Sequence, residues 1–202
     1  MLDESACALT NILGLAPGRA HEFCGPARRV LAAWVMNWGA PVVWLRLRHN
    51  RDRLCPNGLA DWAAPGGMIV AEAAHATDLL ACAEDSLRSG ACALVVLDLA
   101  EPVAMTPLRR LHLAAEDGLA RRRAQQPGTD VRALVLTPDE GGSPGVETRW
   151  HMAPCPANTA PAAQLVGAAW RLARRRARMT PPAQWQVQEK DGGRLHLAAW
   201  PG

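Results

Sequence analysis

The sequence predicts an α/β protein with a mostly parallel β-sheet and helices on both faces. Several continuous apolar runs have the length of strands, among them 42–45, 93–98 and 133–136. Runs without polar alternation suit strands that are covered on both faces. Helical patterns of about 12 residues alternate with these runs, which is typical of βαβ units. A hydrophobic fraction of 49% over 202 residues provides the core of one such domain.

The first elements follow from apolar spacing and from glycine and proline. A short apolar segment over 6–15 precedes a strand at 21–24, which Gly25 and Pro26 end. Apolar residues at helical spacing then predict a helix over 27–38, followed by Gly39 and Pro41, which stop it. The strand at 42–45 comes next. We expect the polar and basic residues after it, 46–58, to form a loop.

The middle of the chain continues the alternation. A short helix is expected at 59–63 and a strand at 68–71. Leu79, Leu80, Ala83 and Leu87 form one apolar face and predict a helix over 77–89, with Thr77 as its cap. The remaining elements expected here are a strand at 93–98, a helix at 106–118, a strand at 133–136, a polar loop at 139–145 and a more exposed strand at 147–152.

The last part of the sequence predicts a helix and a hairpin. The helix is expected over 162–178, after a proline-rich stretch at 154–161. Two short alternating runs, 185–187 and 195–197, flank Asp191, Gly192 and Gly193, which is a hairpin signal. We therefore expect a core domain over 1–160 and a C-terminal helix-and-hairpin extension over 161–202, used for docking a partner.

Composition excludes several classes of protein. The charged fraction of 20% and the apolar content argue against disorder. No apolar run reaches the roughly 20 residues that span a membrane, and the acidic start lacks the positive segment of a signal peptide. Six cysteines without a CxxC pair fit a reducing compartment and predict neither a metal site nor disulfides. We expect a cytoplasmic protein without a membrane contact.

Several short strings, in this order, resemble the RecA core and resemble more closely the ImuA family of bacterial SOS mutagenesis. They lie at 21–26, 44–49, 53–59, 87–98 and 148–150. The similarity covers about residues 20–155. The resemblance implies a RecA-like core in which 21–26 enters the phosphate loop and Asp98 takes the Walker B position.

The phosphate-binding pattern that this resemblance implies is degenerate. A Walker A loop, G-x-x-x-x-G-K-[ST], uses glycine amides, a lysine and a hydroxyl to hold phosphates and Mg²⁺. Counting from Gly25, which Pro26 follows, the second glycine, the lysine and the hydroxyl residue are replaced by Val30, Leu31 and Ala32. The stretch at 46–49 also carries arginines and no glutamate where RecA has its catalytic acid. We therefore expect no nucleotide cofactor and no hydrolysis.

No other catalytic arrangement emerges from the sequence. The six histidines do not form a zinc-protease pattern, and no G-x-S-x-G elbow is present. A Cys–His pair stays open, since such pairs need not be adjacent in sequence, but a buried structural cysteine is the better reading. The expectation is a protein that is not an enzyme, with no catalytic residue, no cofactor and no metal.

Two groups of arginines are candidate binding surfaces. The first is in the loop after the second strand, a candidate contact for nucleic acid or a partner, and consists of Arg46, Arg48, Arg51 and Arg53. The second lies in the expected last helix and, with Trp185 of the hairpin, is the candidate partner surface: Arg171, Arg174, Arg175, Arg176 and Arg178. Arginine and tryptophan are enriched at interface hot spots. The target of this second surface stays open between an acidic protein surface and a nucleic-acid backbone.

The resemblance to the ImuA family implies a function in SOS-induced, error-prone translesion DNA synthesis. The implied partner is an ImuB-type, Y-family polymerase homologue. An error-prone replicative-type polymerase subunit is implied as an indirect partner. RecA and, more weakly, DNA are further candidate partners, which would place the recruited protein at the nucleoid. The alternative is a cell-division inhibitor like SulA, which resembles a RecA core without nucleotide chemistry and binds FtsZ.

Overall fold

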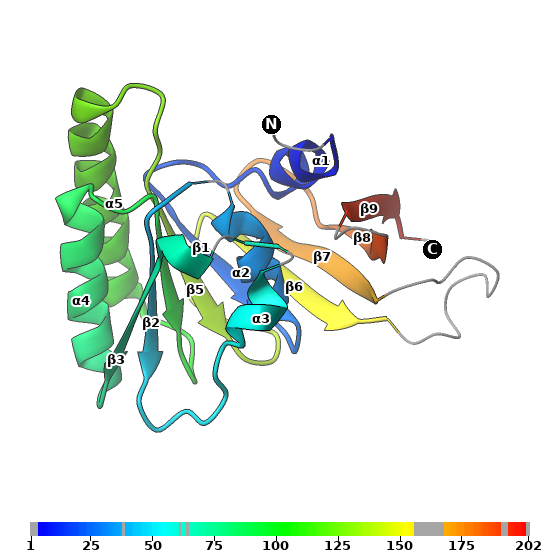
Figure 1. The fold of residues 1–202 in the computed structure, drawn as a ribbon, viewed down its shortest axis with the longest axis horizontal. Coiled ribbons are helices and arrows are strands. Elements are labelled where there is room, and N and C mark those ends of the chain that lie inside the picture. Colours follow the sequence, from blue (N-terminus) through cyan, green and yellow to red (C-terminus); the bar gives the residue numbers. More distant parts are fainter. Residues whose placement is uncertain are drawn as a thin grey trace.

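The computed structural model describes residues 4–37, 39–60, 62–63, 65–155, 168–190 and 194–200. Nine strands form a single sheet in the order β3-β2-β4-β5-β1-β6-β7-β8-β9 (Figure 1). The neighbours from β3 to β6 pair in parallel, and β6 to β9 pair antiparallel. The expected α/β class with a large, mostly parallel sheet is confirmed, and the antiparallel end makes the sheet mixed.

The parallel strands correspond to the apolar runs of the sequence. They are β1 (Ala20–Cys24), β2 (Val42–Leu47), β3 (Met68–Ala73), β4 (Leu94–Asp98), β5 (Arg132–Thr137) and β6 (Thr148–Pro154). Every residue of β1, β2 and β4 is buried, as expected for strands covered on both faces. The expectation of a more exposed strand at 147–152 is wrong, because Trp150 and Met152 are fully buried and His151 and Thr148 nearly so.

The helix expected over 162–178 is wrong over the residues described, since 169–177 is a strand. This strand, β7 (Ala169–Ala177), pairs with β6 on one side and β8 (Ala183–Lys190) on the other, and β9 (Arg194–Ala199) completes the sheet. Trp170 and Leu172 are buried and alternate with Arg171, so the period of two fits a strand. The expected hairpin of β8 and β9 is confirmed.

The expected boundary between residues 160 and 161 lies outside the described residues, as do 162–167 of the expected helix and the turn at 191–193. The described strands after that boundary continue the same sheet as the strands before it.

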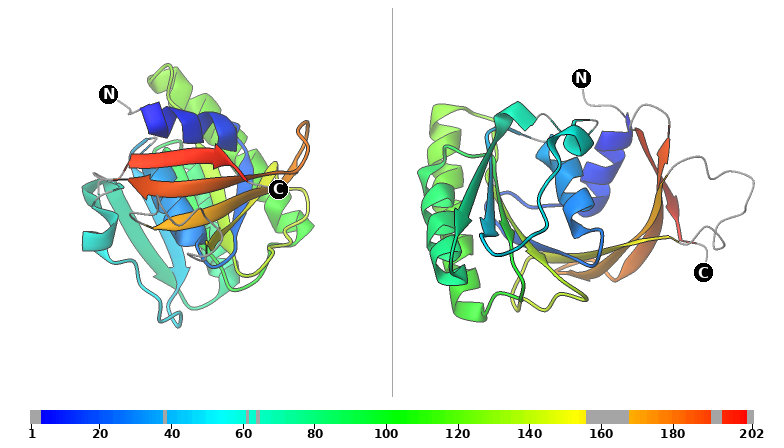
Figure 2. Two further views of the ribbon diagram at one scale, coloured as in Figure 1. Left: turned by 90° about the vertical axis from the view of Figure 1, so that its right-hand side faces the viewer. Right: turned by 60° about the horizontal axis from the view of Figure 1, so that its bottom comes forward.

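Helices lie on both faces of the sheet. They are α1 (Glu4–Leu13), α2 (Arg28–Met36), α3 (Pro56–Leu59), α4 (Ala76–Ser89) and α5 (Met105–Gln125), with a 3-10 turn, η1 (Pro65–Gly67). The pair α4 and α5 covers the face of β1 to β5, and α1 and α2 lie on the opposite face (Figures 1 and 2). His75, not Thr77, is the N-cap of α4, and its side chain makes no capping bond. None of the described helices is long and apolar enough to cross a membrane.

Tryptophans join the antiparallel strands to the rest of the core. Trp34 of α2, Trp62 and Trp170 of β7 meet in edge-to-face pairs, with ring centroids 5.1–6.5 Å apart. Such pairs contribute about 0.5–1.5 kcal/mol beyond the apolar area that they bury. Leu9 of α1, Phe23 of β1 and Leu195 of β9 belong to the same buried cluster. The last three strands are therefore packed into the core on α2's side of the sheet.

Candidate functional site at the carboxyl ends of the parallel strands

A short turn joins β1 to α2 at this edge of the sheet. Only Gly25, Pro26 and Ala27 separate the end of β1 from the start of α2. Gly25 has φ +89, and a Cβ at this position would lie 2.5 Å from the Met152 carbonyl oxygen. Positive φ and close backbone approach both require glycine. The structure thus explains the glycine by packing against β6.

The backbone amides of this turn are occupied within the protein. Pro26 has no N–H group, Ala27 donates to the Met152 carbonyl at 3.0 Å, and Arg28 donates to the Gly25 carbonyl at 3.3 Å. Phosphate loops instead leave several amides pointing at the ligand. The three residues expected at the Walker A positions lie within α2, where Leu31 and Ala32 are fully buried and Val30 packs partly buried against the same core.

An arginine from the first turn of α2 is paired with the carboxylate at the end of β4. The Arg29 Nε donates to Asp98 Oδ2 at 2.6 Å, and its Nη1 donates to Asp52 Oδ2 at 3.0 Å. The Asp98 side chain is only 3% exposed. Burial opposes the charge of Arg29, but the two carboxylates together hold its pKa above the usual value. A protein cation therefore binds the carboxylate that the sequence places at the expected Walker B position.

Arg28 lies beside this pair and points back at its own turn. Its Nη1 donates to the Gly25 carbonyl at 3.2 Å, and burial lowers its pKa, with the nearby Asp98 opposing that effect. Three buried polar atoms in this group have no hydrogen-bond partner among the described residues: Arg28 Nε, Arg29 Nη2 and Asp98 Oδ1. The site holds an ion pair between Arg29 and the buried Asp98 at its centre.

The expected arginine loop after β2 separates into structural and exposed residues. Arg46 is not in the loop, because β2 extends to Leu47 and its side chain is 4% exposed. Its Nε lies 3.4 Å from Glu72 Oε1 of β3, and its Nη1 donates to the Asp52 carbonyl at 2.8 Å. Arg53 also pairs with Glu72, at 3.0 Å. Arg48 and Arg51 are exposed.

The C-terminal arginines lie on β7, except Arg178, which directly follows it; β7 is separated from β2 by four strands of the sheet. Arg174 stacks over the rings of Trp150 and Trp185, at 5.6 and 5.2 Å from their centroids, and its Nε donates to the Pro181 carbonyl. Arg174 and Trp185 are both half-buried, so they pack within the protein.

The other arginines of this group reach the surface. Arg171 stacks over Trp200 at 5.8 Å, and Arg175 pairs with Glu140 at 2.8 Å. Arg176 and Arg178 are exposed. The structure therefore divides the expected docking set into one internal arginine and four outer ones.

The sequence analysis missed a buried carboxylate, Glu22 of β1. It is fully buried and accepts hydrogen bonds from Thr137, from the amide of Gly142, and from both the amide and hydroxyl of Ser143, at 2.9–3.1 Å. Arg149 of β6 donates to its other oxygen. These partners are 115–127 residues away in sequence. The only signal for Glu22 in the sequence was therefore a single charged residue within a predicted strand. Its role is to fix the glycine-rich loop against β1.

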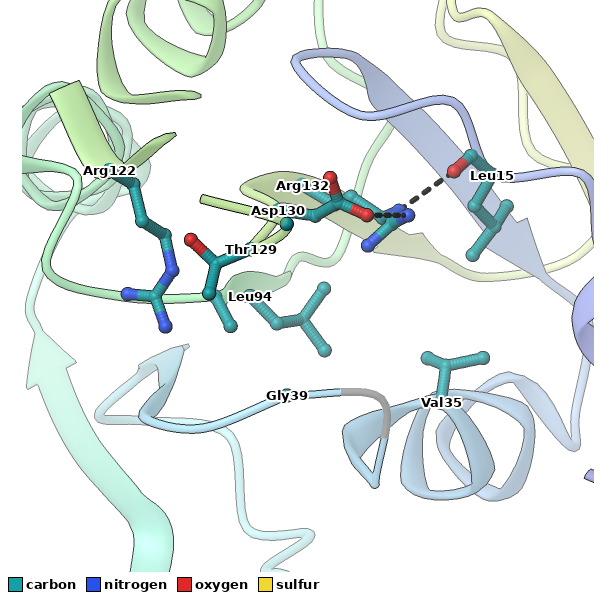
Figure 3. Close-up of a pocket in the computed structure, with 10 residues that line it drawn as sticks. Leu15, Val35, Gly39, Leu94, Arg122, Thr129, Asp130 and Arg132 are labelled. Carbon is teal, nitrogen blue, oxygen red and sulfur yellow. Dashed lines mark hydrogen bonds and ion pairs between the residues drawn. The ribbon is translucent and has the colours of Figure 1, made fainter. Parts of the chain in front are cut away.

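A pocket of about 150 Å³ lies at the opposite, amino edge of the parallel strands (Figure 3). Arg132 in its wall donates to the Leu15 carbonyl and to Asp130, both at 2.7 Å. Arg122 of α5 donates to the carbonyls of Gly90, Ala91 and Ala40. The pocket arginines thus hold chain segments together. Across the residues described, no group of three or more His, Cys, Asp or Glu could hold a metal.

The sequence was compared with models of known protein families and with curated proteins. No family model and no curated protein matches the chain.

Proposed function

We propose that this chain is a RecA-like core without nucleotide chemistry, acting as a non-catalytic accessory protein. The observation that carries the proposal is the ion pair between Arg29 and Asp98. Phosphoryl transfer depends on cations placed around the phosphates, and its metal ion needs a free carboxylate. Here the Oδ2 atom of Asp98 is already paired with a side chain of the protein.

The turn before α2 supports the same conclusion. Its amides at Ala27 and Arg28 donate to Met152 and Gly25, and the next helical turns point Leu31 and Ala32 into the core. Opening this turn for a phosphate would require breaking these bonds and exposing apolar residues. At about 25 cal/mol per Å² of exposed apolar area, that rearrangement is unfavourable.

The process in which the protein acts is proposed from the resemblance of its sequence to the ImuA family. It is SOS-induced, error-prone translesion synthesis, in which the chain binds an ImuB-type polymerase homologue, with RecA as a second candidate. The exposed arginines Arg48 and Arg51 and the outer arginines of β7 are the candidate contact surfaces.

Capture of purified partners tests this proposal. The chain is immobilised and incubated separately with an ImuB-type polymerase homologue, RecA and FtsZ, each with and without ATP and Mg²⁺. We expect capture of the polymerase homologue to be unchanged by ATP. Capture of FtsZ alone would contradict the proposal and favour a division inhibitor like SulA.

A direct nucleotide-binding measurement completes the test. A fluorescent ATP analogue is titrated with this chain, and an active RecA serves as the positive control. We expect no saturable signal with the wild type. Saturable binding that is lost on substituting Asp98→Asn would show that the site accepts a nucleotide and that the proposal is wrong.

A further inference from the structure

The positive charge of the protein is concentrated in its last three strands. Residues 168–200 contain seven basic and two acidic residues, whereas the whole chain contains 22 and 19. The net charge of this segment is therefore +5, against +3 for the entire chain, and the remainder is weakly acidic. Charge of one sign gathered on one surface attracts a partner of the opposite sign.

The strands β7 to β9 present one face to the core and the other outward. Trp170, Leu172 and Val187 lie in the core cluster on the inner face. Their neighbours in sequence therefore lie on the outer face, where register places Arg171 beside Gln186 and Ala173 beside Gln184. The left panel of Figure 2 shows these strands facing the viewer with α2 behind them.

The outer face has the side chains of a nucleic-acid surface. Its described members on β7, β8 and β9 that reach the surface include arginine, glutamine, histidine and alanine but no acidic residue: Arg171, Arg175, Gln184, Gln186, Gln188, His196 and Ala198. Glu189 points to the other face and accepts a hydrogen bond from Trp62. Glu140 is paired with Arg175 at 2.8 Å.

An open groove lies at the end of this face where β7 leads into β8. It has a volume of about 470 Å³, and its lining includes Arg174, Arg175, Pro182, Ala183, Gln184 and the ring of Trp200. The Arg171 guanidinium lies over the same Trp200 ring. Cationic grooves that follow a backbone, with an aromatic ring for stacking a base, are the common features of single-strand binding sites.

We infer that the outer face of β7 to β9 binds single-stranded nucleic acid. Arg171 and Arg175 contact phosphates, the Trp200 ring stacks on a base, and Gln184 and Gln186 offer amides to base edges. The inference rests on the proposed function for its context, since synthesis past lesions exposes a template strand. An acidic protein segment would use the arginines, but it would have no use for a stacking ring in the groove.

Fluorescence anisotropy with the full chain and a labelled thymidine oligonucleotide of about 20 residues tests the inference. The proteins compared are the wild type, the variants R171Q/R175Q and W200L, and the control variant R109Q/R121Q. The control removes the same charge from exposed residues of α5. We expect R171Q/R175Q to lower affinity at least tenfold and to reduce the slope of log K against log salt by about 1.4, at about 0.7 per single-strand phosphate contact. W200L should lose about tenfold, whereas the control should remain within about twofold of the wild type.

Three results would overturn the inference: equal affinity of R171Q/R175Q and the control, equal binding of single strand and duplex, or complete competition by a glutamate-rich peptide at equal charge concentration. The last would assign the face to an acidic protein segment. Because the assay contains no partner protein, its failure leaves the partner-capture result for the proposed function unaffected.

Discussion

His21 of β1 makes the stability of this protein sensitive to acid. Its ring is fully buried, with Nδ1 2.8 Å from the Thr148 hydroxyl and Nε2 3.1 Å from the Ala16 carbonyl oxygen. The carbonyl can only accept, so Nε2 carries the proton and Nδ1 accepts from Thr148. Burial lowers the pKa of His21 from 6.5 to about 4, although the hydrogen bond to Ala16 opposes the shift.

The expected loss of stability follows from this shift in pKa. The unfolded chain binds a proton at His21 near pH 6.5, and the folded chain binds it only near pH 4. Stability is therefore complete above the higher value and falls as pH decreases toward the lower one. A difference of about 2.5 pKa units at 1.36 kcal/mol each corresponds to about 3 kcal/mol lost by about pH 4.

Urea denaturation at about pH 7.5 and about pH 4 measures this effect, with tryptophan fluorescence as the signal. We compare the wild type with H21Q, whose amide can still donate to Ala16, and with H75Q as the control at an exposed histidine. Burial also lowers the pKa values of His112 and His151, so H21Q should keep part of the dependence. H75Q should keep all of it. An equal pH-dependent loss in H21Q and the wild type would refute the reasoning, as would a His21 resonance that titrates near pH 6.5.

Three further predictions concern packing and charge. In Gly118→Ala, the new Cβ would meet the Leu87 carbonyl oxygen at 1.8 Å, so thermal denaturation should show a loss of at least about 2 kcal/mol. Gly66→Ala, with nothing within 4 Å, should change stability by less than about 0.5 kcal/mol, and equal losses in both would contradict the close contact. R29L should cost about 3 kcal/mol by leaving Asp98 unpaired, and R29L/D98L should recover most of that in a double-mutant cycle; additive losses would show that the pair is not coupled. W170A should cost about 3–5 kcal/mol and remove near-ultraviolet circular dichroism from the tryptophan cluster, and an unchanged spectrum would argue against the edge-to-face packing.

The parallel strands could be predicted from sequence because burial on both faces leaves a local signal. Residues 93–97 and 133–136 are continuous apolar runs, and Val95 and Leu134 within them are fully buried. The strand β7 could not be recognised in the same way. Its alanines and arginines suit a helix, and Trp170 and Leu172 are too few to decide the period. Pairing with β6 and β8 determines its conformation, and those partners are distant in sequence.

The candidate site was predictable in part. The replacements expected at Val30, Leu31 and Ala32 follow from the string after Gly25, and the place of Asp98 at a strand end follows from the apolar run before it. The pairing of Asp98 with Arg29 joins residues 69 apart, and that of Arg46 with Glu72 joins β2 to β3. Such contacts depend on which strands become neighbours in the sheet, so local sequence cannot show which charges are structural.

The contact between α1 and β9 has a consequence for synthesis on the ribosome. Leu9 and Leu13 near the beginning of the chain share one buried cluster with Leu195 near its end. The first helix therefore cannot complete its packing until the last strand has emerged, and a chain stopped early leaves those leucines in water. We expect nonsense mutations before β9 to yield unstable fragments that proteases remove.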